Sequence, residues 1–390
     1  MTEEHGGPPD VPDHPEPDPR LRGFPPPPPP GYPAPAPGYG MAPYPARPYG
    51  ALPYPPPAPP PLVPALPLEP RRYTQLLRGP RYRWWKPLLA LLLGSFLVVG
   101  FSFITIVPPL VVGLVTGVPN LGSYLFTTLT DVDNLGPVGF VALNLSLIIL
   151  IPAVVLSIWV VHGVRPRFVS SVTGGIRWRW LLTCLVIVVP VWVLYIGFGV
   201  LVDPTAGPRP AHWVALLVIV VLTTPLQAAG EEYFFRGWIM QNVGAWFARP
   251  LVGLVVTTAL STVLFSLAHG SLDIWVLGNI GCFAVAACLA TWRTGGLEAG
   301  IAMHAVNNIL AFFVAIVFGG WTNVFVGSDT KGTVVQFLLS LLVHGVALAL
   351  IWWQAGRQSL PYLSRPSWPA PAQLEGSAPW QPAASAGQSS

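Results

Sequence analysis

Long apolar segments dominate the middle of this chain and limit the kind of fold that it can adopt. Eight such segments are found in the 390 residues, each close to the roughly 20 residues that a helix needs to cross a bilayer. Their approximate bounds are 87–115, 137–161, 180–202, 212–247, 251–269, 274–292, 298–320 and 334–354. Only 9% of the residues are charged, whereas soluble domains carry about a quarter. The sequence therefore predicts an all-α polytopic membrane bundle of about eight transmembrane helices.

The two ends of the chain differ from this apolar middle. Residues 1–80 hold 29 of the 48 prolines, with glycine, alanine and tyrosine between them, and residues 358–390 are similar. Such segments bury too little apolar surface to offset their ordering entropy, so we expect a disordered tail at each end. The N-terminal tail is either a docking segment for a proline-recognising partner or a solvated low-complexity segment.

Basic residues flank the apolar segments and predict the orientation of the chain. Lys and Arg are frequent at 71–86 and again at 162–180, but they are absent from 116–137. Loops rich in Lys and Arg stay on the cytoplasmic side, so we expect a multi-pass cell-membrane protein with both termini in the cytoplasm. The net charge of +4 is explained by these flanks, and no nucleic-acid motif accompanies it. The three cysteines give neither a disulfide framework nor a C-x-x-C metal motif.

Charged side chains inside the fourth apolar segment are the first candidates for chemistry. The stretch "QAAGEEYFFRG" places Glu231, Glu232 and Arg236 after some fifteen nearly apolar residues, where ionisable groups are costly and usually functional. Glu232 and Arg236 are four residues apart and can pair on one helix face. Glu231 points about 100° away and lacks a local partner. We interpret Glu231 as a candidate general base, with a structural ion-pair cluster as the alternative.

A histidine at the end of the fifth segment can meet Glu231. The stretch "STVLFSLAHG" ends with Phe265 and His269 one turn apart. Residue Pro250, in the turn between the two segments, is the midpoint of 231 and 269. If both arms are helical, Glu231 and His269 lie at about the same depth, and Phe265 can form a wall beside them.

The seventh segment supplies a third polar group. His304 and Asn308 are four residues apart and share a helix face, whereas Asn307 points about 100° away. Two donors on one face can stabilise an oxyanion. Each residue taken alone can equally be a hydrogen bond between neighbouring helices. The isolated His344 in the eighth segment is interpreted in that way, or as a cavity-lining residue.

These three motifs together resemble those of a known family. E-E-x-x-x-R (Glu231, Glu232, Arg236), F-x-x-x-H (Phe265, His269) and H-x-x-x-N (His304, Asn308) are similar to the motifs of the CAAX-protease and bacteriocin-processing family. This family, also called the Abi family, consists of multi-span intramembrane glutamic endopeptidases. The resemblance covers about residues 212–310 and does not extend to the first three segments or the tails.

The resemblance implies a role for each motif residue. Glu231 would activate a water that His269 helps to hold, His304 and Asn308 would stabilise the oxyanion, and Glu232, Arg236 and Phe265 would support them. It also implies catalysis without a metal. From the residues alone, Glu231, His269 and His304 can also bind zinc, although the chain has no H-E-x-x-H motif.

The function predicted from the sequence is therefore hydrolysis of peptide bonds within the membrane. The expected divisions are 1–80, a cytoplasmic tail; 81–211, N-terminal transmembrane helices; 212–320, the catalytic core; 321–357, the last transmembrane helix; and 358–390, the C-terminal tail. The substrate is expected to be a peptide or a membrane protein, prenylated or not. The alternatives are a non-catalytic immunity or partner-stabilising protein, a zinc-dependent membrane protease, and a transporter, which would require inverted repeats that the sequence lacks.

Overall fold

All eight predicted spans are present as helices in the computed structural model, which describes residues 63–131, 135–202 and 207–365. Eight helical stretches there are long and apolar enough to cross a membrane: Lys86–Val115, Pro137–His162, Trp178–Val202, Trp213–Trp246, Pro250–Leu267, Ile274–Thr294, Glu298–Phe318 and Val334–Arg357. The only strand-like pairing in the described residues is two isolated bridges. The all-α membrane fold is thus confirmed, and the tail predictions for 1–62 and 366–390 lie outside the described residues.

The first span is interrupted, and the loop after it contains a helix. The span consists of α1 (Lys86–Ser102), the 3₁₀ turn η3 (Phe103–Ile106) and α2 (Val107–Val115). The following segment, predicted as a loop, forms α3 (Leu121–Thr130), whose start is capped by the Asn120 side chain. A helix this short cannot cross a bilayer and gives no long apolar run, so the hydropathy pattern does not reveal it.

The second and third spans frame a connection that carries one short helix. The second span comprises α4 (Pro137–Ile148) and α5 (Leu150–His162). After α5 come α6 (Arg167–Ser170) and then α7 (Trp178–Val202), which tolerates Pro190 in its interior. Gly163 ends α5 with φ of 71°, a left-handed conformation that glycine adopts at little cost.

The fourth span changes its helical type at the charged motif. It begins with α8 (Trp213–Glu232), continues as the π-helical turn η4 (Tyr233–Ile239) and ends with α9 (Met240–Asn242) and the 3₁₀ turn η5 (Gly244–Trp246). Continuation of the helix to about residue 247 is therefore confirmed. Segments of π-helix are rare and are frequently found at functional sites. Glu231 and Glu232 are the last two residues before this turn.

The last four spans are single helices. They are α10 (Pro250–Leu267), α11 (Ile274–Thr294), α12 (Glu298–Phe318) and α13 (Val334–Arg357), with the 3₁₀ turn η6 (Trp321–Asn323) between the last two. Asp273 caps α11 and also accepts from the backbone N–H of Gly332. These N–H donors, that of Val276 first, lower the pKa of the Asp273 carboxyl from its ordinary value.

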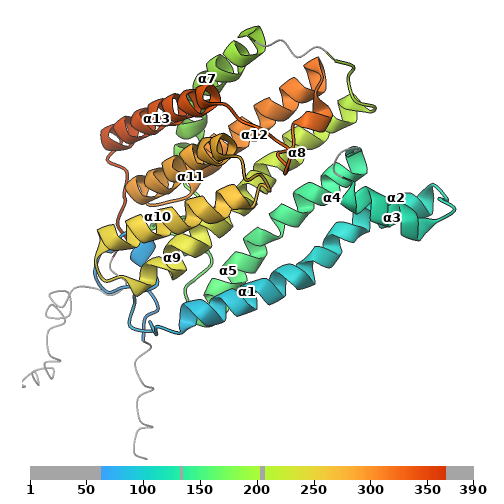
Figure 1. Ribbon diagram of the computed structural model, residues 1–390. Helices are drawn as coiled ribbons and strands as arrows, with labels where there is room; N and C mark the ends of the chain where they lie inside the picture. Colours follow the sequence, from blue (N-terminus) through green and yellow to red (C-terminus); the bar gives the residue numbers. More distant parts are fainter. Residues whose placement is uncertain (1–62, 132–134, 203–206, 366–390) are drawn as a thin grey trace, which may run out of the picture. The chain divides into compact units, whose positions relative to one another are not determined.

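The helices that carry the polar motifs pack directly against one another. α12 packs against α8 and α7, α4 packs against α8, and α11 contacts α10, α12 and α13 (Figure 1). The facing surfaces are rich in fully buried small residues such as Ala284, Ala287, Cys288, Ala299 and Ala302. Small side chains let helix backbones approach closely where lipid provides no hydrophobic drive for association. The cysteines in the described residues are all free.

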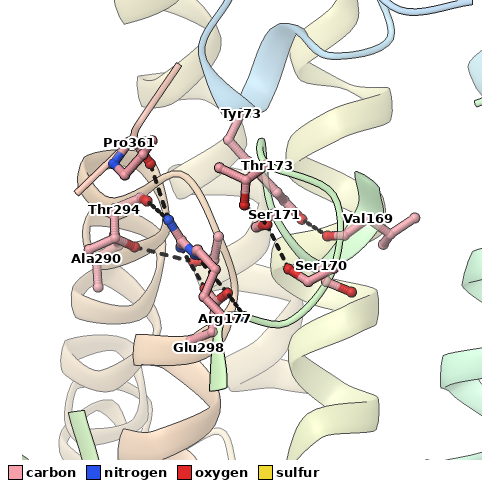
Figure 2. A network of polar contacts seen from close by, with 12 residues as sticks. Tyr73, Val169, Ser170, Ser171, Thr173, Arg177, Ala290, Thr294, Glu298 and Pro361 are labelled. Carbon is pink, nitrogen blue, oxygen red and sulfur yellow. Dashed lines mark hydrogen bonds and ion pairs between the residues drawn. The ribbon is translucent and has the colours of Figure 1, made fainter. Parts of the chain in front are cut away.

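A polar cap, made of residues 71–78, 167–177, 294–298 and 361–364, closes one end of this bundle. At its centre Arg177 donates from Nε and Nη2 to the two carboxylate oxygens of Glu298, at 2.9 and 2.6 Å, and from Nη1 to the carbonyls of Thr294 and Pro361. Figure 2 shows the Arg177 side chain with Glu298, Thr294 and Pro361 around it. The Glu298 side chain is fully buried, so the ion pair is compensated by several hydrogen bonds, as buried charges require.

Residues 63–80, expected to belong to the N-terminal tail, instead pack into this cap. Tyr73, in the turn η2 (Tyr73–Gln75), is buried and donates to the carbonyl oxygen of Val169. Gln75 donates to the carbonyl of Ala248 at 2.8 Å. Residues 358–365, expected in the other tail, also pack here, since Ser364 and Arg71 exchange hydrogen bonds. The prediction from proline content therefore gave tails that are too long. A few apolar and polar side chains are enough to anchor these two segments to the bundle.

Candidate active site

The three sequence motifs converge on one cavity between the helices. It has a volume of about 350 Å³ and is lined by residues of α4, α7, α8, α10, α11, α12 and α13. Glu231, Phe265, His269, His304 and Asn308 all contribute to its wall. The structure therefore brings together the predicted site residues, apart from Glu232 and Arg236, which lie behind this wall.

Glu232 and Arg236 form the predicted pair. Arg236 Nη1 donates to Glu232 Oε1 at 2.9 Å, and both side chains are fully buried. Arg236 also lies over the rings of Phe265 and Phe283, 4.5 and 5.0 Å from their centroids. Two further nitrogens of this arginine have no hydrogen-bond partner, so the aromatic faces provide a cation–π substitute for them.

Glu232 also holds His304, a contact that sequence spacing did not predict. His304 Nδ1 lies 2.9 Å from Glu232 Oε1, and because a carboxylate only accepts, the imidazole nitrogen is the donor. The other nitrogen, Nε2, is 3.8 Å from Glu231 Oε2. His304 thus lies between the two glutamates, bonded to one and facing the other.

Glu231 was expected to lack a local partner, but it has one. Gln227 Nε2, one helical turn earlier, donates to Glu231 Oε1 at 2.5 Å. The Glu231 side chain is 12% exposed, whereas that of Glu232 is fully buried. Glu231 is therefore the glutamate of the pair that contacts the cavity, with one oxygen bound by Gln227 and the other directed towards His304.

His269 lies just beyond the end of α10 rather than within a helix. Its Nδ1 is 2.8 Å from the carbonyl oxygen of Phe265, so this nitrogen must donate. In the neutral ring, Nε2 is then left as an acceptor. The ring packs at 4.8 Å against that of Phe265, which confirms a wall of the cavity at Phe265. His269 and Glu231 line the same cavity.

Asn308 shares its helix face with His304, and its amide is already partly occupied. Asn308 Nδ2 donates to Gln227 Oε1 at 3.2 Å. Since an amide carries two N–H bonds, one remains for another acceptor. Asn308 can therefore still offer one donor, and both His304 and Asn308 are held in place by groups on α8.

Several cavity residues were missed or placed elsewhere by sequence reasoning. Gln227 was missed because it carries no charge. Its position four residues before Glu231, on the same helix face, was the signal that could have indicated their contact. Asn307, expected to point away, lines the cavity, as does Asn144 of α4. His344 also lines it, as one of its two interpretations required, and it bonds within its own helix to the Ser340 carbonyl at 2.7 Å.

Gly300 provides the space that Glu232 occupies. A Cβ atom added at Gly300 would lie 2.6 Å from Glu232 Oε2, well inside contact distance. This glycine is on α12, one turn before His304. The backbone of α12 therefore approaches the carboxylate closely enough to exclude any side chain, which places His304 within reach of it.

For metal binding, the described residues contain no group of three or more His, Cys, Asp or Glu side chains close enough to hold an ion. Glu231, His269 and His304, named above as a conceivable zinc set, line the cavity without forming such a group.

The comparison with protein families selects the same part of the chain. Residues 210–310 match the family described as type II CAAX prenyl endopeptidase Rce1-like. This region is similar to the Rce1-like family. It contains α8 to α11 and the first half of α12, and with them each motif residue described above. The resemblance noted from the motifs is thereby confirmed. It agrees with the helical, multi-pass membrane fold described above.

A curated relative is consistent with this assignment. The uncharacterized protein YyaK of Bacillus subtilis (strain 168) is 26% identical over 149 residues, which cover 35% of this chain and 49% of YyaK. The chain thus spans about half the length of the relative that it matches. No solved structure matches the chain. The similarity to the Rce1-like family therefore rests on the region 210–310 and the motifs in it.

Proposed function

We propose that this chain is an intramembrane endopeptidase in which Glu231 activates the water that attacks the peptide bond. The observation that carries the proposal is the convergence of Glu231, His269, His304 and Asn308 on one cavity inside membrane-spanning helices. Ionisable groups at this depth are costly and mark functional pathways or sites. The Rce1-like match of the same region supports a membrane protease.

Glu231 and His269 would prepare the water. Glu231 Oε2, the oxygen that Gln227 does not occupy, accepts one water proton. His269 Nε2 accepts a hydrogen bond from the other, because Nδ1 is engaged by the Phe265 carbonyl. The water oxygen then bonds to the carbonyl carbon, and the carbonyl oxygen becomes an oxyanion.

His304 and Asn308 would stabilise this oxyanion. The His304 Nδ1 proton is committed to Glu232, so donation from Nε2 requires the imidazolium form. Glu232 lies on the Nδ1 side of the ring, and Arg236 pairs with Glu232. With Glu231 ionised, the four charges of this group sum to zero, which suits a buried setting. The free N–H of Asn308 supplies the second donor.

The tetrahedral intermediate would collapse with transfer of the Glu231 proton to the leaving amine. The carbon–nitrogen bond breaks, the amine departs as a neutral –NH2 group that carries this proton, and Glu231 returns to its carboxylate form. No covalent bond to the protein forms at any stage. Every proton moved belongs to the attacking water, so the step needs no further reactant.

The proposed substrate class follows from the family match. A peptide carrying a prenylated cysteine near its C-terminus is the first probe, since the matching family is one of CAAX prenyl endopeptidases. The same peptide without the prenyl group tests whether the lipid is required. Unmodified membrane-protein segments form a third class of probe.

Substrate trapping tests the proposal directly. Membranes containing the Glu231→Gln variant are compared with wild-type membranes by mass spectrometry of accumulating peptides and proteins, and trapped species are then offered to purified wild-type protein. We expect cleavage by the wild type and none by the variant. Equal cleavage by both would overturn the role of Glu231. Stable capture without cleavage by either would favour the non-catalytic, partner-stabilising alternative.

A further inference from the structure

A continuous row of hydrogen bonds leads from a buried tryptophan to the candidate general base. Trp192 Nε1 donates to Asn307 Oδ1 at 3.0 Å, Asn307 Nδ2 to Asn308 Oδ1 at 3.1 Å, Asn308 Nδ2 to Gln227 Oε1 at 3.2 Å, and Gln227 Nε2 to Glu231 Oε1 at 2.5 Å. Three helices, α7, α12 and α8, contribute to the row. We call Asn307, Asn308 and Gln227 the amide relay.

The two ends of the row fix its direction. An indole N–H can only donate, and an ionised carboxylate can only accept. The oxygen and nitrogen of an amide side chain are otherwise interchangeable by a flip. Here one orientation alone satisfies all four bonds: each carbonyl faces Trp192 and each NH₂ faces Glu231. Every amide dipole therefore presents its positive end towards the glutamate.

The surroundings favour strong coupling along the row. Trp192 and Gln227 are buried, at 0% and 5% exposure. In such a setting hydrogen bonds are less screened than in water, and successive bonds polarise one another. The ring of Trp192 also packs edge-on against that of His344 at 5.2 Å. The start of the row is thus held by packing as well as by its hydrogen bond.

We propose that the amide relay positions Glu231 and selects Oε2 as the oxygen that takes the proton from water. Gln227 occupies Oε1, while Oε2 lies on the side of His304. Gln227 and Asn307 are then positioning residues for the reaction, although neither acts on the substrate itself. The role in catalysis rests on the proposed function, whereas the hold on the Glu231 carboxylate does not.

A purely structural alternative must be distinguished. Polar side chains between transmembrane helices also join them without any other task. A hydrophobic carbodiimide such as dicyclohexylcarbodiimide separates the two, because it reacts with the protonated carboxyl group and needs no substrate. Gln227 occupies Oε1, so breaking the relay should leave both carboxyl oxygens open to the carbodiimide and increase the reaction at Glu231. Mass spectrometry of the peptide containing residue 231 measures the modified fraction.

The labelling experiment uses full-length protein in its membrane and a matched control. Gln227→Met removes the final donor at similar length, and Asn307→Leu breaks the row two links earlier. Asn144→Leu is the control, since Asn144 lines the same cavity but donates to Thr223, outside the relay. We expect several-fold faster labelling with Gln227→Met, a smaller increase with Asn307→Leu, and none with the control. No increase in either relay variant, or an equal one in the control, would overturn the proposal.

A conservative variant protects the test against misfolding. Trp192→Phe keeps an aromatic ring in the packed position and removes only the indole donor. It should increase labelling of Glu231 in the same direction as Asn307→Leu. If Gln227→Met and Asn307→Leu both fail to accumulate in the membrane, Trp192→Phe decides the question. Unchanged labelling of Glu231 in Trp192→Phe then counts against the relay.

Kinetics with a quenched fluorescent peptide carrying a farnesylated cysteine provide the second readout. Gln227→Met should lower kcat on the order of 10²-fold with little change in KM, the scale of a misplaced catalytic group. Asn307→Leu should lower kcat about fivefold, as for one net hydrogen bond. In the Gln227→Met background, Asn307→Leu should add no further loss, because the row is already broken.

The two readouts separate failure of the relay from failure of the proposed function. Independent, multiplicative losses in the double variant would assign Asn307 a structural role and contradict the relay. If wild-type protein and Glu231→Gln are equally inactive on the farnesylated peptide, the proposed substrate fails. The carbodiimide result then decides by itself whether the relay holds the Glu231 carboxylate.

Discussion

Glu231 and Glu232 are adjacent in sequence and differ in nearly every contact. Glu232 is fully buried between Arg236 and His304, whereas Glu231 reaches the cavity and accepts from Gln227. Their directions differ because successive helical residues are rotated by about 100°. The sequence was sufficient to assign the Arg236 pairing. It was insufficient for His304, because a contact between residues 232 and 304 depends on how α8 and α12 pack.

The different surroundings predict different consequences of substitution. Glu231→Gln should abolish turnover without lowering the unfolding temperature, because Gln keeps the size and most of the hydrogen bonding. Glu232→Gln removes the charge that compensates buried Arg236, and breaking a buried pair costs about 3–5 kcal/mol. Thermal unfolding in detergent and peptide cleavage measure the two effects.

An exposed ion pair provides the control for this comparison. Glu69 pairs with Arg71 at 3.0 Å, but its side chain is 75% exposed. Surface pairs contribute little to stability, so Glu69→Gln should change neither activity nor unfolding temperature. A Glu232→Gln variant as stable as Glu69→Gln would contradict the structural role assigned to Glu232.

The chemistry proposed for these residues needs no metal ion, so we predict that cleavage does not depend on one. We expect EDTA and 1,10-phenanthroline to leave cleavage unchanged, and elemental analysis of active protein to give far less than one zinc per chain. The zinc alternative requires inactivation by chelators and recovery with added zinc. Reversible inhibition together with stoichiometric zinc would refute the metal-free mechanism.

At the scale of elements, hydropathy located the spans and could not reveal their irregularities. The predicted bounds lie within a few residues of the helices because a 20-residue apolar run has one stable state in lipid. The π-helical turn η4 was not predictable, since α- and π-helix leave the same apolar pattern over seven residues. The cavity depends on side chains from seven helices, so single motifs indicated its residues but not their mutual contacts.

Two glycines in different helices should respond in opposite ways to the same substitution. Gly300→Ala places a methyl group against the Glu232 carboxylate, so we expect lower kcat and a lower unfolding temperature. In the interior of α13, Gly345 has open space around its Cβ position. Gly345→Ala should leave activity intact and stability unchanged or higher, because alanine is the better helix former. Unfolding and cleavage assays on both variants test this, and equal effects would argue against the close approach at Gly300.

For the whole molecule, the eight spans place the ends of the described chain on the same side of the membrane. The sequence predicted eight spans because each apolar span is separated from the next by a polar or turn-forming segment. The side itself was predicted from the basic loops and remains a proposal: the polar cap faces the cytoplasm.

Cysteine labelling tests the proposed orientation. In a background without the native cysteines, we expect Thr127→Cys to react with an impermeant maleimide added from outside the cell. Arg165→Cys and Ser359→Cys, both at exposed positions, should react only after the membrane is opened. The predicted outer position near residue 206 lies outside the described residues. Labelling of position 127 only from the inner side would reverse the orientation.

The antiparallel bridge between Arg72 and Leu363 has a consequence for the connectivity of the chain. It places two residues side by side that are separated by most of the sequence, so the segment from 72 to 363 is nearly a closed ring. A short linker could join its ends, and new termini could be opened in the connection between α3 and α4. A chain circularly permuted in this way keeps every helix contact around the cavity, so its order of synthesis can change while its site does not.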